Sequence, residues 1–81
     1  MEAIAQDSPL FPWISSDPDR LSGEPVFRGT RVPVRSLFEH LASDYTISGF
    51  LDQFEGVACE QVVAVLMLAV ERLIADSTPR Q

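Results

Sequence analysis

Hydrophobic and polar positions follow a helical period through the second half of the chain. Apolar residues between positions 33 and 42 recur at spacings of three and four, which predicts an amphipathic helix of about ten residues with Pro33 in its first turn. A second, shorter helix is predicted after Thr46, a good N-cap, and Gly56 is expected just beyond its C-cap. The two apolar stripes are Val34, Leu37, Phe38, Leu41 and Ala42, and then Ile47, Phe50, Leu51 and Phe54.

A third predicted helix, residues 58–75, is apolar on nearly every side. Ala58 is a poor N-cap, although the Gln61 side chain is positioned to bond back to the backbone. Two short helices are able to cover only one of its two apolar stripes, so we expect the second stripe to meet another chain. The first stripe is Val62, Leu66, Ala69 and Leu73, and the second, our candidate dimer interface, is Val63, Met67, Val70 and Ile74.

The first half of the chain predicts short extended pieces and turns. Residues 1–12 are polar and interrupted by proline, which predicts a flexible arm, and Trp13 is expected to anchor that arm to the core. Two extended pieces, 26–28 and 31–32, flank Gly29 and Thr30, and a tight turn there favours a positive φ at Gly29. We therefore predict a mainly α fold, with a short N-terminal β segment or hairpin followed by three helices, in one domain spanning residues 13–76. Residues 77–81 are expected to fray.

Length and cysteine usage narrow the class of protein. The 81 residues allow one small domain, whose stability from its own core is slim. One cysteine excludes an internal disulfide, and one cysteine with one histidine is too few for a zinc site. The longest apolar run, residues 62–70, is too short to span a membrane, and the start of the chain lacks the basic and apolar segments of a signal peptide. These features predict a cytoplasmic protein.

The charges are distributed unevenly. The net charge is -6, yet residues 20–35 carry four arginines against one glutamate, a local balance of +3. Arg28, Arg31 and Arg35 of this cluster are candidates for binding phosphates or carboxylates. The alternative is that they are solvated surface charges paired with local acids such as Glu39.

The sequence offers no convincing catalytic set, and we expect neither enzyme activity nor a cofactor or metal. His40 is expected on the outer face of the first helix, and Cys59 has no basic partner nearby in the sequence. The second and third helices, joined by a short turn, have helix–turn–helix spacing. The start of the third helix offers only Gln61 as a plausible reader of bases, and no cation before Arg72, which disfavours DNA reading by this helix.

One segment of the chain resembles a known family. The string Gly-Glu-Pro-Val-Phe-Arg-Gly-Thr-Arg-Val-Pro-Val over residues 23–34, preceded by Ile-Ser-Ser-Asp-Pro over residues 14–18, is similar to the signature of domain-of-unknown-function family 433 (DUF433). The similarity extends over about residues 13–75. It implies a homeodomain-like three-helix fold after a short β segment, and a VapB-type antitoxin encoded beside a PIN-like ribonuclease toxin. This chain departs from the family pattern at Gly49, Ala58 and Cys59, which weakens the expectation of DNA reading.

Two functions from different classes follow. The leading hypothesis is an antitoxin that neutralises a PIN-like ribonuclease by direct binding, with operator DNA as a further candidate partner. In it, an arginine of the cluster is inserted among the clustered carboxylates that hold the metal of such a nuclease. The alternative is a homodimeric interaction or structural module with no nucleic-acid role, which the acidic balance and the uncharged start of the third helix favour.

Overall fold

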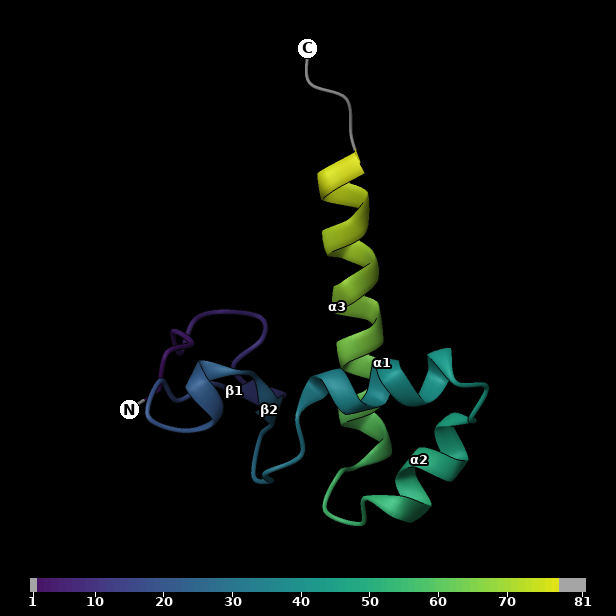
Figure 1. Cartoon of the computed structure of the whole chain (residues 1–81). Helices are drawn as coiled ribbons and strands as arrows, with labels where there is room; N and C mark the ends of the chain where they lie inside the picture. Colours follow the sequence, from purple (N-terminus) through teal and green to yellow (C-terminus); the bar gives the residue numbers. More distant parts are fainter. Residues whose placement is uncertain (1, 78–81) are drawn as a thin grey trace.

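A two-stranded hairpin and three α-helices make up the part of the protein that the computed structural model describes, residues 2–77 (Figure 1). In chain order the elements are β1 (Ile14–Ser15), the 3-10 helix η1 (Leu21–Gly23), β2 (Val26–Phe27), α1 (Val34–Ala42), α2 (Ile47–Gln53) and α3 (Cys59–Ser77). The strands are antiparallel, with Ile14 opposite Phe27 and Ser15 opposite Val26. This confirms the predicted fold class, a short β segment followed by helices.

The turn after β2 has the glycine geometry that the sequence predicts. Gly29 has a φ of +84°, a left-handed conformation that costs a side-chain-bearing residue about 1–2 kcal/mol. Thr30 closes the turn on both sides, because its hydroxyl donates to the Phe27 carbonyl oxygen (2.7 Å) and accepts from the Val32 N–H (3.0 Å). The Phe27 N–H also donates to the Val32 carbonyl oxygen at 3.0 Å. The segment after the turn is therefore fixed against β2.

The starts of α2 and α3 follow simple capping rules, whereas α1 starts without a side-chain cap. Pro33 is the N-cap of α1, with extended backbone angles, rather than a residue of its first turn as predicted. The Thr46 hydroxyl accepts from the Gly49 N–H at 3.0 Å, which confirms the predicted cap of α2. At the start of α3, the Ala58 N–H donates to Oε1 of Gln61 (2.9 Å), the return bond that the sequence predicts.

The end of α2 differs from the prediction. Its C-cap is Phe54, with a φ of -119°, and Gly56 does not have a positive φ. The chain instead turns through a bond from the Val57 N–H to the Phe54 carbonyl oxygen (3.0 Å), which places Val57 in the core. This bond ends on the carbonyl of the C-cap residue, Phe54, and the turn that it closes does not require a left-handed glycine.

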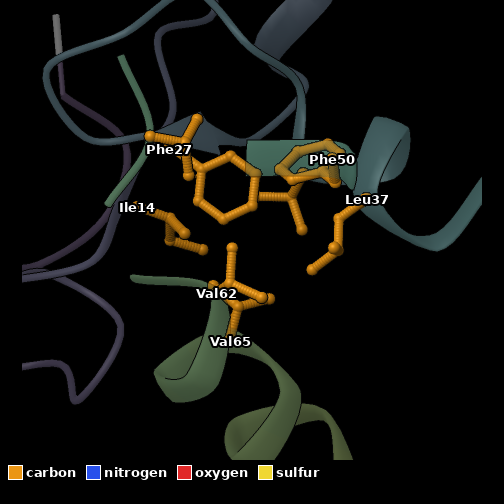
Figure 2. Close-up of a cluster of buried hydrophobic side chains, with 8 residues drawn as sticks. Ile14, Phe27, Leu37, Phe50, Val62 and Val65 are labelled. Atoms are coloured by element: carbon orange, nitrogen blue, oxygen red, sulfur yellow. The ribbon is translucent and has the colours of Figure 1, made fainter. Parts of the chain in front are cut away.

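The core lies where β2, α1, α2 and the beginning of α3 meet (Figure 2). Phe27 and Phe50 are fully buried, with ring centroids 6.0 Å apart, and Leu37 and Val62 are fully buried beside them. Ile14 and Val65 close the cluster from β1 and α3. Trp13 packs against this core, as the sequence predicts for an anchor of the N-terminal arm.

Helix α3 packs against this body only by its first turns and then projects away from the other elements (Figure 1). Its buried residues are Val62 and Val65, and Leu66 is partly buried against the core. Leu73, predicted to continue the first stripe, is 66% exposed because no other element of the body lies beside the helix at that height. The prediction that this stripe is buried along its whole length is therefore wrong beyond the middle of α3.

The two ends of the chain bear on the predicted domain limits. Residues 2–12, predicted as a flexible arm, form turns here and contact the hairpin, and their flexibility stays a prediction. Ser77 is the last residue of α3, and the rest of the predicted frayed tail, residues 78–81, lies outside the described residues. Within the described chain, no helix combines the length and the apolar character needed to cross a membrane.

Candidate binding site

The predicted arginine cluster extends from the hairpin to the first turn of α1, which carries Arg35, and Arg28 is its most constrained member. Its Nε donates to the Phe11 carbonyl oxygen, and its Nη2 donates to the Ile14 carbonyl oxygen at 3.0 Å. The guanidinium carbon lies 3.9 Å from the centre of the Phe11 ring, in the geometry of a cation–π contact. Two carbonyl oxygens and one aromatic face therefore hold the charged group in a single orientation, with about a third of the side chain exposed.

A carboxylate from the N-terminal arm completes the surroundings of Arg28. Oε1 of Glu2 lies 2.9 Å from Nη2 of Arg28, and Oε2 of Glu2 accepts from the Ser16 N–H at 3.0 Å and from the Ile4 N–H at 3.2 Å. The hydrogen bond from the Ser16 backbone is the main cause that holds the pKa of Glu2 below its usual value of 4.5. The surroundings of Glu2 therefore stabilise the ionised form of its carboxylate.

Arg31 has a different environment. It is exposed just after the hairpin turn, and within residues 2–77 it makes no ion pair. It lines a hollow of about 570 Å³, together with Arg20 and Arg28 and the three acids Glu2, Asp17 and Glu24. The backbone of Gly29 and Thr30 forms part of the same wall. An anion entering this hollow from outside would therefore meet Arg31 as a cation to which no carboxylate of residues 2–77 is paired.

Arg35 pairs with an acid that the sequence analysis did not single out. Its Nε lies 2.9 Å from Oε1 of Glu24, in the loop before β2, rather than near Glu39 on the same helix. Both side chains reach solvent, and the arginine is exposed over two thirds of its surface, so the pair contributes little to stability. Arg35 keeps most of its surface available for contacts with a partner.

Gln61, the candidate base reader, is engaged within the molecule. Its amide nitrogen donates to the carbonyl oxygens of Trp13 (3.3 Å) and Arg28 (3.0 Å), and its amide oxygen accepts from the Ala58 N–H. All three bonds would have to be released before this side chain could read a base edge. The structure thus gives Gln61 a positioning role: it holds the hairpin, at Arg28, to the first turn of α3.

The four residues of the candidate dimer interface lie exposed along α3. Their exposed fractions range from 46% at Val70 to 62% at Ile74. The four residues are Val63, Met67, Val70 and Ile74. A continuous apolar stripe that faces solvent is the feature expected of an interaction surface. Whether a second copy covers it stays a prediction.

His40 and Cys59, considered above for catalysis, differ from each other in environment. His40 is half-buried rather than on the outer face of α1 as expected, with its ring against Tyr45, Phe50 and Phe54 at centroid distances of 5.3–5.5 Å. Its Nδ1 donates to the Ser36 carbonyl oxygen at 2.8 Å, and its Nε2 lies 2.9 Å from Oε1 of Gln53. His40 thus joins α1 to α2, while Cys59 is an exposed thiol at the start of α3.

Sequence reasoning missed Glu2 as part of the site. Glu2 is 26 positions from Arg28 in the chain and lies in a stretch without periodicity, so no local pattern points to their contact. The only available signal was the charge distribution, an acidic arm followed by an arginine cluster. That signal indicates attraction between the two segments without identifying the pair.

Comparison with known proteins places this hairpin and its helices in one family. The family model described as "Protein of unknown function (DUF433)" matches residues 14–69, which include the hairpin, α1, α2 and the packed part of α3. Comparisons with curated proteins and with solved structures gave no match. The arm that carries Glu2 and the projecting end of α3 lie outside the matched segment.

Proposed function

This chain belongs to the DUF433 family, and we propose that it acts as the antitoxin of a type II toxin–antitoxin pair, binding a PIN-like ribonuclease toxin directly. The observation that carries the proposal is Arg31, an exposed guanidinium with no ion pair within residues 2–77, beside the hollow on the hairpin. A nuclease that holds metal with clustered carboxylates presents the complementary charge. A guanidinium is able to bond two carboxylate oxygens at once, which gives both charge neutralisation and a defined geometry.

The rigidity of the hairpin supports this role. Thr30 bonds to both arms of the turn, and Gln61 ties the Arg28 carbonyl to α3, so the backbone around Arg31 is fixed before a partner arrives. Less conformational freedom is then lost on binding, which increases affinity for a given set of contacts. Arg28 and Arg35 flank Arg31, and both are partly available to solvent.

Operator DNA is the second candidate partner of the arginines, through phosphates rather than bases. The exposed residues at the start of α3 are Cys59 and Glu60, which supply no positive charge, and Gln61 is engaged within the molecule. Phosphate contacts would come from exposed arginines of the cluster such as Arg20, Arg31 and Arg35, against a net charge of -6. These features favour the toxin over DNA as the target.

The exposed stripe on α3 favours a homodimer under either function. The alternative function is a homodimeric interaction module with no nucleic-acid role. Val63, Met67, Val70 and Ile74 are separated by four, three and four residues, the spacing at which helices pack along a coiled-coil seam. Half-exposed side chains of this size would each gain about 1 kcal/mol by full burial. Because a domain with so small a core has little stability of its own, burial of this stripe in a dimer would be a substantial addition to it. The stripe and Arg31 lie on different elements, so one molecule is able to use both.

Co-expression with the product of the adjacent reading frame, which the proposal expects to be PIN-like, tests the proposed function. We expect the two proteins to co-purify and the growth defect caused by the toxin to be relieved. Arg31→Ala should weaken the complex at least about tenfold, because a carboxylate on the toxin loses its partner. Arg72→Ala is the matched control: it also removes one exposed arginine, but from α3, where Arg72 pairs with Asp76 at 3.3 Å.

Each alternative has its own result. Failure to co-purify, or equal loss in the two arginine variants, would overturn the antitoxin assignment. A stable homodimer that binds neither toxin nor promoter DNA would establish the interaction module instead. If promoter DNA is bound through the cluster, Arg31→Ala flattens the dependence of affinity on salt, by roughly one unit of log affinity against log salt.

A further inference from the structure

We propose that the free side of β1, with Arg28, is a binding site for an extended acidic peptide segment, and that residues 2 and 3 occupy this site within the molecule. Three groups of the hairpin region form it: the N–H and the carbonyl oxygen of Ser16, which directly follows β1, and Nη2 of Arg28. The inference concerns recognition of a partner's carboxylate, so for its biological partner it rests on the proposed function.

The contacts of the arm are those that a bound peptide would make. One carboxylate oxygen of Glu2 meets Arg28 at 2.9 Å, and the other accepts from the Ser16 N–H at 3.0 Å. The next residue, Ala3, donates its N–H to the Ser16 carbonyl oxygen at 2.7 Å. A glutamate followed by one residue therefore satisfies every group of the site. One main-chain bond just beyond the end of a strand, together with a side chain in a charged clamp, resembles the way in which peptide segments add to the edges of sheets.

The site is formed by the hairpin together with Phe11 at the end of the arm, and it does not depend on Glu2 for its shape. Arg28 is oriented by the carbonyl oxygens of Phe11 and Ile14 and by the Phe11 ring. Ser16 is fixed from the other side, since its hydroxyl donates to the Gly23 carbonyl oxygen. Glu2, in contrast, is held through its carboxylate and is 30% exposed. An incoming carboxylate would find the clamp already assembled once Glu2 leaves.

The neighbouring hollow determines which ligand fits best. Its charged lining consists of three arginines and three acids, so departure of Glu2 leaves an excess of one positive charge. Glu24 remains paired with Arg35, and Asp17 lies 3.9 Å from Nε of Arg20, whereas Arg28 loses its carboxylate partner and Arg31 has none among residues 2–77. A segment with two acidic residues would place one carboxylate on Arg28 and the second on Arg31. The ligand class is therefore an acidic, extended peptide, and neutral or basic segments should bind more weakly because they leave the excess positive charge unpaired.

Peptide titration of the full-length protein tests the site. The probe is the N-acetylated, C-amidated tetrapeptide Glu-Ala-Ile-Ala, which has the sequence of the arm from Glu2 to Ala5, and its binding is followed through the amide NMR signal of Ser16. Glu2→Gln, which releases the clamp, should bind the probe about tenfold more tightly than the wild type, because an arm in place about nine-tenths of the time masks the site by that factor. Glu60→Gln removes the same charge from α3 and should leave the affinity unchanged.

A second probe keeps the result independent of any change in folding. The tetrapeptide Gln-Ala-Ile-Ala has the same backbone bonds available but no carboxylate, so it should bind the Glu2→Gln protein at least about tenfold more weakly than the acidic probe. Equal affinity for the two probes, no gain in Glu2→Gln, or an equal gain in Glu60→Gln would each overturn the proposal. Probe binding without co-purification of a toxin would refute the antitoxin assignment alone, and the reverse result would refute this site alone.

Discussion

The body of the molecule and the projecting end of α3 both contain large apolar residues, but these lie in opposite environments. In the body, Phe27, Phe50, Leu37 and Val62 from four different elements enclose one another and leave no exposed surface. Along the end of α3, Met67, Leu73 and Ile74 are each more than half exposed. Apolar content alone therefore does not predict burial in this chain; it depends on whether another element is close enough to cover the residue.

The difference shows which part of the fold is self-sufficient. The body is stabilised by contacts between segments far apart in the sequence, including the Gln61 bonds to Trp13 and Arg28. Beyond the body, the only ion pair on α3 within the described residues is local, from Arg72 to Asp76 one turn later. A helix supported mainly by local bonds is marginal in water unless its apolar face is covered. The end of α3 thus gains most from a partner.

Truncation of a side chain in the core should cause the largest loss in free energy of unfolding. Phe27→Ala removes a fully buried ring that contacts Phe50, and the expected loss in free energy of unfolding is about 3–5 kcal/mol. Because a domain of this size has only a few kcal/mol in total, the variant should be largely unfolded at 25 °C. Urea titration followed by circular dichroism measures the loss. Leu73→Ala, at a 66% exposed position, is the comparison in the projecting region and should cost less than about 1 kcal/mol in the monomer.

A charge in the exposed stripe should affect association more than folding. Met67 is 56% exposed in the single chain, so Met67→Glu should leave the fold intact. It should raise the dissociation constant of the homodimer about 100-fold, because two carboxylates would be buried at the interface. Sedimentation equilibrium measures this constant. Ala75→Glu adds the same charge next to the stripe rather than in it and serves as the control. A wild-type protein that remains monomeric at micromolar concentration would contradict the dimer.

A substitution in the hairpin turn should have a smaller effect, a loss of folding stability in the body alone. Gly29 has a φ of +84°, and a Cβ added there would meet no atom within 4 Å, so the cost of a substitution is conformational. Gly29→Val should lower the free energy of unfolding by about 1–2 kcal/mol. Gly56→Ala is the control, since Gly56 lacks a positive φ and its added Cβ would only touch Thr30 at 3.4 Å. Equal melting temperatures for wild type and Gly29→Val would show that the turn relaxes without strain.

The smallest expected effect is a pH dependence of the body. The pKa of Glu2 is lowered in the folded state, first by the Ser16 N–H, so its contribution to stability is complete above the usual value of 4.5 and is lost as the pH falls through the lower, folded-state value. The urea midpoint should therefore decrease more between pH 5.5 and pH 3 in the wild type than in Glu2→Gln. Asp17, whose pKa is also lowered, first by the Asp19 N–H, is present in both proteins and cancels in the comparison.

Local features of the fold were predictable from the sequence because they depend on neighbouring residues. The Thr46 cap, the return bond of Gln61 to Ala58 and the positive φ of Gly29 each follow from residue type and spacing. Helical periodicity also located the stripe of α2 and the buried Val34 and Leu37 of α1. Two other members of the predicted α1 stripe, Phe38 and Ala42, are exposed, because no element of the described chain covers that side of the helix. At the end of α2, however, the expectation that Gly56 follows the C-cap was wrong. The Val57 N–H bonds to the Phe54 carbonyl oxygen, and this bond makes the turn without a left-handed glycine.

Features that depend on distant contacts were not predictable in this way. The partner of Arg35 is Glu24 rather than Glu39, because the loop before β2 lies beside α1 in the folded chain. His40, assigned to the outer face by its position in the helical period, is half-buried because α2 brings Phe50 and Phe54 against it. The arginines of the candidate site were identified from charge, but their separate environments depend on tertiary structure.

The Gln61 amide also has a consequence for the order in which the chain folds. Its bonds to Trp13 and Arg28 span 48 and 33 residues, so they form only after most of the chain has been brought together. Closing such long loops costs entropy that local helix formation does not, and contacts of this kind slow folding. We expect the α1–α2 pair, which is linked through nearby residues, to form first, and docking of the hairpin onto α3 to complete the native state. In this order Arg28 and Arg31 would reach their final positions only in the last step, so incompletely folded chains would not display the binding site.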